Sequence, residues 1–277
     1  MNRILISDSS CDIFSLSGAA FTSVPLHVLT AERDYADLPG QDVAAMVREL
    51  KQYKGRTSTS CPNAAEWEAA FGDAEEVFAV TITGALSGSC NAARCAAEQY
   101  MQQHPGRQVH VVDSLSTGPE LVLILEKLRD LTRSGHDFAY TKAAITEYQQ
   151  QTKLLFILSS VQNLANNGRA SRLEAKAVGL LGIRILGQAS TEGRLEVLDK
   201  CRGEDAGLMK AVLHMKKCGW NKGRVILTHC FNEEGAKKLR AALREVSPGC
   251  EVTILTTGIL CSYYAEEGGL LIGYEAF

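Results

Sequence analysis

Short apolar runs alternate with amphipathic stretches through the first half of the chain. Four runs have the character of buried strands and end at polar or glycine-containing turns: residues 4–6, 24–29, 77–82 and 109–112. Between them, apolar residues spaced at i, i+3, i+4 and i+7 predict helices over residues 43–50 and 121–128. This alternation predicts a doubly wound α/β domain over residues 1–150, with a parallel sheet covered by helices on both faces.

The pattern changes after about residue 150. Residues 163–171 have the composition of a polar loop, and the runs at 183–186 and 195–198 predict adjacent strands joined by a glycine-containing turn. The other predicted elements are strands at 154–158, 225–227 and 252–255 and helices at 208–215 and 236–246. Adjacent strands mixed with helices predict an α+β domain with a mixed sheet over residues 151–277.

Four polar turns are candidates for a ligand site, because ligands of doubly wound sheets sit beyond the carboxyl ends of the strands. They are residues 8–10, 57–61, 83–89 and 113–116. The turn at 57–61 lies between two predicted helices. We therefore expect it to cross the same edge of the sheet without being a strand end.

Two of these turns are rich in hydroxyl groups. Residues 57–62 read Thr-Ser-Thr-Ser-Cys-Pro, residues 84–89 read Gly-Ala-Leu-Ser-Gly-Ser, and each precedes a helix-like stretch. A helix start offers unpaired N–H groups and a partial positive charge, so these turns suit an anion. Neither has the Lys-Ser/Thr pair of a nucleotide loop, which argues against a nucleotide triphosphate.

Composition narrows the class of protein. The chain has 277 residues, a hydrophobic content of 45% and a formal net charge of −3, so no global attraction to nucleic acid or anionic membrane is expected. Nine cysteines without a C-x-x-C pair predict reduced thiols and no metal site. No stretch approaches the roughly 20 apolar residues of a membrane span, and the N-terminus lacks a signal core. We expect a cytoplasmic protein without stable membrane insertion.

Seven segments, in order, resemble motifs of the DegV family of bacterial fatty-acid-binding proteins. The first is Ile4-Leu5-Ile6-Ser7-Asp8-Ser9-Ser10-Cys11-Asp12, which is similar to the family's D-S-T/S-x-D start. The others resemble its T-S-Q-P-S, L-S-G-T-Y-x-S-A, V-V-D-S, G-G-R-[IV]-S and K-x-R motifs and a strand-to-helix turn: residues 59–63, 86–93, 111–114, 167–171, 200–202 and 229–236. The similarity spans almost the whole chain.

The resemblance implies a long-chain fatty acid held in a tunnel between two domains. Carried over by position, Thr59 and Ser87 would donate hydrogen bonds to its carboxylate, and Gly88 and Ser89 would add backbone donors. Burial of the tail favours an acid of about 14 to 18 carbons, such as palmitate. The family also implies a carrier without a cofactor, which presents the acid to the catalytic subunit of a fatty-acid kinase.

Other roles remain open for the polar residues. Thr59 and Ser87 also suit helix caps. A role in support of the ligand-contacting residues, or in contact with a partner, is predicted for Asp8, Ser9, Asp113, Ser114, Arg169, Arg202 and His229. The alternative hypothesis is a small-molecule enzyme that acts on a phosphorylated or carboxylated metabolite in the cleft between the domains, with Asp8, Asp113 and His229 as candidate catalytic residues. No nucleophilic side chain paired with a general base accompanies them.

The chain departs from the family pattern in three places. Where members carry a T-H-x-G-P-G turn, residues 256–269 lack the G-P-G turn and Gly258 replaces the histidine. Asn166 and Asn167 stand where a basic residue usually precedes G-G-R, and the segment after Gly182 lacks the family's I-K-P proline. In the family, these regions lie near the kinase contact.

Overall fold

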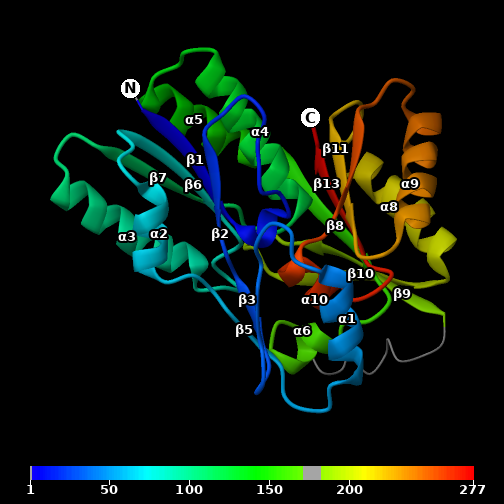
Figure 1. Cartoon of the computed structure of the whole chain (residues 1–277). Helices are drawn as coiled ribbons and strands as arrows, with labels where there is room; N and C mark the ends of the chain where they lie inside the picture. Colours follow the sequence, from blue (N-terminus) through cyan, green and yellow to red (C-terminus); the bar gives the residue numbers. More distant parts are fainter. Residues whose placement is uncertain (1, 171–181) are drawn as a thin grey trace.

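A computed structural model of the chain describes residues 2–170 and 182–277 (Figure 1). The first half contains the strands β1 (Arg3–Asp8), β2 (Phe21–Val24), β6 (Glu76–Thr81) and β7 (Gln108–Asp113). They form a parallel sheet in the order β2-β1-β6-β7. Alternate side chains point to opposite faces, so Leu5 and Phe78 pack in one layer and Ile6 and Val77 in the other.

Helices cover both faces of this sheet, as the sequence predicts. On one face lie α2 (Ala64–Phe71) and α3 (Ser89–Gln103), and on the other lie α4 (Pro119–Arg133) and α5 (Phe138–Gln149). A 3-10 turn, η1 (Ser9–Cys11), follows β1 directly. The doubly wound character of the first half is confirmed.

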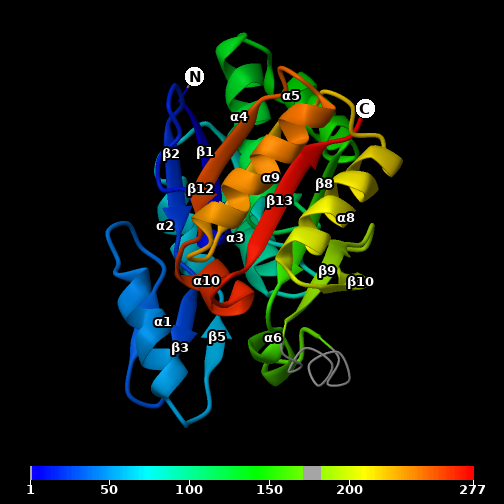
Figure 2. The same cartoon turned by 90° about the vertical axis from the view of Figure 1, so that its right-hand side faces the viewer.

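A small antiparallel sheet projects from this half. It contains β3 (His27–Leu29), β4 (Asp34–Ala36) and β5 (Ser58–Ser60) in the order β4-β3-β5, with α1 (Val43–Gln52) beside it (Figure 2). Two predictions were wrong here. The single strand predicted at 24–29 is divided between two sheets at Pro25, which has no N–H to donate to a ladder. The turn predicted at 57–61 contains strand β5, which pairs with β3.

A mixed six-stranded sheet occupies the second half and confirms the predicted α+β character. Its strands are β8 (Thr152–Leu158), β9 (Ile183–Ala189), β10 (Leu195–Arg202), β11 (Val225–His229), β12 (Val252–Thr256) and β13 (Leu270–Glu275). The order is β10-β9-β8-β13-β11-β12, with only the β11–β12 pair parallel among these strands. The strand β13 and its central place were not predicted.

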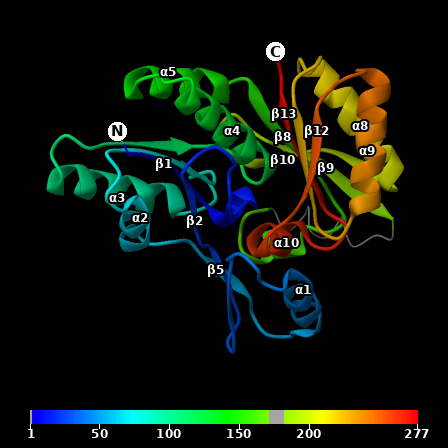
Figure 3. The ribbon, with the colours of Figure 1, turned by 45° about the horizontal axis from the view of Figure 1, so that its top comes forward.

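Helices α8 (Glu204–Lys217) and α9 (Glu233–Val246) cover one face of this sheet (Figure 2). The short helices α6 (Gln162–Asn166) and α10 (Ile259–Ala265) lie near its other face. The loop predicted at 163–171 is therefore corrected: its first residues continue α6, which begins at Gln162, and Ser171 lies outside the described residues. Figure 3 shows α4 between the two sheets, where it contacts strands of each.

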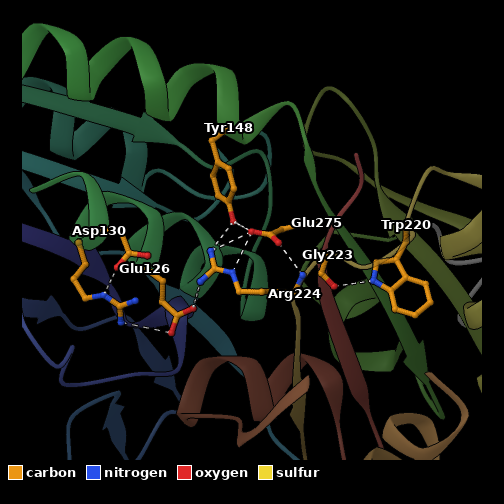
Figure 4. A network of polar contacts seen from close by, with 8 residues as sticks. Glu126, Asp130, Tyr148, Trp220, Gly223, Arg224 and Glu275 are labelled. Carbon is orange, nitrogen blue, oxygen red and sulfur yellow. Dashed lines mark hydrogen bonds and ion pairs between the residues drawn. The ribbon is translucent and has the colours of Figure 1, made fainter. Parts of the chain in front are cut away.

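Arg224 ties the two halves of the chain together at the start of β11 (Figure 4). Its guanidinium donates to Glu126 of α4 at 3.1 Å, to Tyr148 of α5 at 3.2 Å and to Glu275 of β13 at 3.1 Å. Burial acts to raise the pKa of Glu275, but the hydrogen bonds from Tyr148 and Arg224 outweigh it and lower that pKa. The second sheet begins at Thr152, and the domain boundary near residue 150 stays a prediction.

Candidate functional site

A cavity of about 310 Å³ is lined by residues of the small antiparallel sheet, the six-stranded sheet and α10, together with the loops between them. Its wall is mainly apolar and includes Leu154, Phe156 and Leu158 of β8 and Leu271 of β13. The polar part of the wall consists of Thr59, Ser60, Ser87, Gly88, Thr117, Arg169 and Tyr264 together with Cys61 and Cys261. Such a volume is at the lower end of the range of small-molecule sites, and the lining suits a ligand with a long apolar part and a small polar end.

The two hydroxyl-rich segments meet in the wall of this cavity. Thr59 comes from β5, while Ser87 and Gly88 immediately precede α3. A Cβ on Gly88 would lie 3.1 Å from the Cys61 sulfur, so a glycine allows the two segments to approach closely. The Ser87 hydroxyl accepts a hydrogen bond from the Ser89 N–H at 3.2 Å. Sequence reasoning therefore identified two segments that the fold brings together.

Ser89 has a different environment from the one expected. Its side chain is fully buried, does not border the cavity and donates to Asp8 at 2.6 Å. Asp8 also accepts from the Ser10 hydroxyl at 2.5 Å and from the Ile82 N–H at 2.9 Å. Burial raises the pKa of Asp8, while these hydrogen bonds act to lower it. Asp8 and Ser89 thus fix the end of β1 to the start of α3, behind the cavity wall.

Ser9, Asp113 and Ser114 also hold loops in place. The Ser9 hydroxyl accepts from the Leu26 N–H at 2.9 Å. Asp113 accepts from the N–H groups of Gly84 and Leu115, each at 3.1 Å. The Ser114 hydroxyl donates to the Ser116 carbonyl at 3.1 Å. None of these three residues borders the apolar cavity, although Asp113 anchors the loop that leads to Ser87.

The three predicted basic residues lie in different places. Arg169 borders the cavity and donates to the carbonyls of Asn167 at 2.6 Å and Leu86 at 3.4 Å. Arg202 is exposed at the end of β10, outside the cavity wall. His229 is buried at the end of β11, where burial lowers its pKa and Nδ1 accepts from the Asn232 N–H at 3.3 Å. The fold does not bring His229 and Asp113 to the cavity wall.

Helix α10 contributes side chains that sequence reasoning missed. The Tyr264 hydroxyl lies 2.8 Å from the Thr59 hydroxyl, and both residues border the cavity. The feature of the sequence that could have indicated these side chains is the tyrosine pair at 263–264, inside the segment that departs from the family pattern. Its place beside Thr59, more than 200 positions away, follows from the packing of α10 and not from local pattern.

The structure also explains the glycine at position 258. Its N–H donates to Asp12 at 2.7 Å, and the next two N–H groups donate to Asp37 at 2.8 and 3.1 Å. A Cβ on Gly258 would lie 2.8 Å from an oxygen of Asp37, so a histidine at this position would displace the Asp37 carboxylate from its present place. Burial raises the pKa of Asp37 to about 6 and raises that of Asp12 as well.

The described part of the chain contains neither a cluster of metal-ligating side chains nor a helix that could span a membrane. Within residues 2–170 and 182–277, no group of three or more His, Cys, Asp or Glu side chains is arranged to hold a metal ion. Helices in the same ranges are too short or too polar to cross a bilayer. All nine cysteines are free thiols.

Comparisons with family models, curated proteins and solved structures all lead to the same protein family. A model of the DegV family matches residues 4–276. A DegV domain-containing protein of Streptococcus pneumoniae strain R6 is 42% identical over 275 residues, which cover 98% of each chain. Curated relatives from other streptococci, such as Streptococcus gordonii at 38% identity, cover the same share.

Solved structures also resemble the chain over its whole length, and two of them share about 40% of its residues. The Fatty Acid Kinase B3 protein of Streptococcus pneumoniae, loaded with linoleic acid, superimposes with a TM-score of 0.98 at 41% identity and covers 100% of both chains. A DegV family protein of Eubacterium eligens, loaded with heptadecanoic acid, gives a TM-score of 0.97 at 39% identity and covers 99% of this chain and 100% of the other.

Proposed function

The chain belongs to the DegV family, and from this membership we propose that it binds a long-chain fatty acid in the apolar cavity. The carboxylate is held where Thr59, Ser87 and Gly88 meet, and the acyl tail extends along the leucine-rich wall. The two relatives of known structure described above were solved with heptadecanoic acid and with linoleic acid. We propose an acid of about 14 to 18 carbons, such as palmitate, for this chain.

The observation that carries this proposal is an apolar cavity whose wall includes hydroxyl donors and a helix start. Each buried methylene contributes about 0.8 kcal/mol, so the tail supplies most of the binding free energy. Hydroxyl and N–H donors suit a single carboxylate, and Arg169 adds a positive charge on the same wall. An enzyme of charged metabolites needs reactive polar groups on this wall, whereas Asp8, Asp113 and His229 lie behind or outside it.

The role we propose is that of a carrier. The chain is 41% identical over its whole length to a Fatty Acid Kinase B3 protein, which favours presentation of the acid to a kinase catalytic subunit. We further propose two domains, 1–150 and 151–277, with the acid between them, and a cytoplasmic location in keeping with nine free thiols. No resident cofactor enters this role.

Mass spectrometry of a solvent extract from the purified protein tests the proposal. We expect one fatty acid of about 14 to 18 carbons per chain. After delipidation, the protein should bind added palmitate with an affinity that calorimetry can measure. Protein that carries no acid and also fails to bind added acid would exclude the carrier function.

A double substitution locates the carboxylate. Thr59→Ala with Ser87→Ala removes two donors and should weaken palmitate binding by about 2 to 5 kcal/mol. Thr57→Ala is the matched control, because Thr57 lies on the same segment but its hydroxyl contacts Tyr263, and it does not border the apolar cavity. Equal affinities for the double variant and the control would place the carboxylate elsewhere.

A further inference from the structure

Two neighbouring tyrosines of α10 reach two different cavities. Tyr264 borders the apolar cavity, whereas Tyr263 borders a separate, mainly polar cavity of about 570 Å³. Each hydroxyl meets a threonine: Tyr264 Oη lies 2.8 Å from Thr59 Oγ1, and Tyr263 Oη lies 2.6 Å from Thr57 Oγ1. The chain thus contains two chemically matched pairs, of which one faces the apolar cavity.

The Tyr264–Thr59 pair has a hydroxyl proton to offer. Each hydroxyl donates once, and within the pair one group donates while the other accepts. The proton of the accepting group is then available to a further acceptor, and both residues border the cavity. A carboxylate accepts several hydrogen bonds, so on binding it can also take the proton of the other hydroxyl, which exchanges its bond within the pair for a charge-assisted one.

The surroundings of Tyr264 favour an anion as that acceptor. Burial raises the pKa of its phenol, although the bond to Thr59 and the charge of Arg169 act to lower it, so the group stays a neutral donor. Arg169 is close enough to influence this phenol and borders the same cavity. A carboxylate placed between them meets donors and a positive charge.

We propose that the Tyr264 hydroxyl is a third donor to the fatty-acid carboxylate, beside Thr59 and Ser87. This role rests on the proposed fatty-acid binding and deepens it. Thr59 and Ser87 come from the first half of the chain and Tyr264 from the second, so the carboxylate is held from both sides. Tyr264 stands in the segment that departs from the family's T-H-x-G-P-G turn.

Binding of palmitate and of 1-hexadecanol to delipidated protein tests this role. The alcohol has the same chain length but no charge, so it reports packing of the tail without the carboxylate. Tyr264→Phe should weaken palmitate binding about tenfold or more, the effect of one hydrogen bond to a charged group, and change alcohol binding by less than about threefold. Tyr263→Phe is the matched control and should leave both affinities within about twofold of wild type.

Each outcome has a definite meaning. A selective loss of palmitate binding in Tyr264→Phe supports the third donor. Unchanged or tighter palmitate binding, or an equal loss for acid and alcohol, overturns it, because the hydroxyl would then compete with the ligand or only pack. If the wild-type protein binds no fatty acid, the proposed function itself fails, and the variants are not needed to show it. Thermal unfolding of both phenylalanine variants, which keep the aromatic ring, verifies that the fold is intact.

Discussion

The hydroxyl of Thr83 donates a hydrogen bond to the carbonyl of Gly193 at 3.0 Å, across 110 positions of the chain. Thr83 begins the loop that carries Ser87, and its carbonyl accepts from the Ser87 N–H at 3.2 Å. Gly193 lies in the turn between β9 and β10 and has a φ of +74°. One turn of the second half thus supports the loop that we assign to the carboxylate.

Gly193→Ala should therefore weaken both the fold and the binding of palmitate. The new Cβ would overlap the Thr83 hydroxyl, and the positive φ is itself unfavourable for alanine. Gly40→Ala is the control, since Gly40 has a φ of +79° and open space around its Cβ position. We expect a loss of about 1 kcal/mol for Gly40→Ala and of about 2 to 4 kcal/mol for Gly193→Ala in urea unfolding. Equal losses would mean that the turn has room to adjust.

Phe156 borders both the apolar cavity and a small neighbouring one of about 20 Å³. Its ring lies against Gly187, which leaves no room for a Cβ. Phe156→Ala should join the two spaces and shift the preferred acid by about two or more carbons towards longer chains. Competition among acids of about 14 to 20 carbons, which span the proposed range and its longer neighbours, measures this shift.

Leu155→Ala is the control for Phe156→Ala. Leu155 is fully buried on the opposite face of β8, in the core beneath α8 and α9. Its loss should destabilise the protein by about 2 to 5 kcal/mol and leave the ranking of acids unchanged. The same change of ranking in both variants would argue against a specific role for Phe156.

Glu120 makes stability depend on pH. Burial raises the pKa of its carboxyl from 4.5 to about 7, although a hydrogen bond from the Thr152 hydroxyl at 2.7 Å acts to lower it. At a pH between 4.5 and about 7, this carboxyl is protonated in the folded protein and ionised in the unfolded chain. Its contribution to the free energy of unfolding is therefore fully present below pH 4.5 and is lost as the pH rises through 7.

Glu120→Gln should remove this dependence. The amide keeps an acceptor for Thr152 and does not ionise. As the pH rises from acidic to mildly alkaline, the free energy of unfolding of the variant should therefore increase by about 1 to 3 kcal/mol relative to that of the wild type. Urea unfolding of both proteins across that range measures the difference. A difference that does not change with pH would show that Glu120 has the same pKa in the folded and the unfolded protein.

Arg224 should matter more to stability than Arg129, the other arginine that pairs with Glu126. Arg224→Met leaves the buried carboxylate of Glu275 without its cation and should cost about 2 to 4 kcal/mol. Arg129→Met breaks ion pairs whose acidic partners are more exposed, and should cost below about 1 kcal/mol. Chemical unfolding compares the two, and similar losses would contradict the importance of the network in Figure 4.

Elements with a strong local pattern were predictable. The strands that begin near Ile4, Val77 and Val109 and the amphipathic helix around Leu121 carry their periodicity in a few neighbouring residues. Short or weakly patterned elements were not. The strand β5 consists of three hydroxyl residues whose partner, β3, lies far earlier in the chain, so only the pairing makes it a strand.

The candidate site follows the same division. The two hydroxyl-rich segments were recognised from local chemistry, because hydroxyls and a helix start suit an anion. The choice of Thr59 and Ser87 as carboxylate donors came from the family resemblance and stays a prediction. Ser89 was expected to add a backbone donor for the ligand, yet its N–H donates to the Ser87 hydroxyl and its own hydroxyl donates to Asp8. Tyr264 was missed because nothing near it in sequence indicates Thr59.

By itself, the sequence determined the α/β class, the hydroxyl-rich segments and the resemblance to a fatty-acid-binding family, because these properties are encoded in residues close together along the chain. Only the tertiary structure decided which segments meet: β5 beside the start of α3, α10 across from both, and an apolar wall from β8 and β13 between them. The physical reason is that hydrophobic burial is non-directional. It drives collapse, but only the full set of packed elements specifies which distant side chains share a cavity.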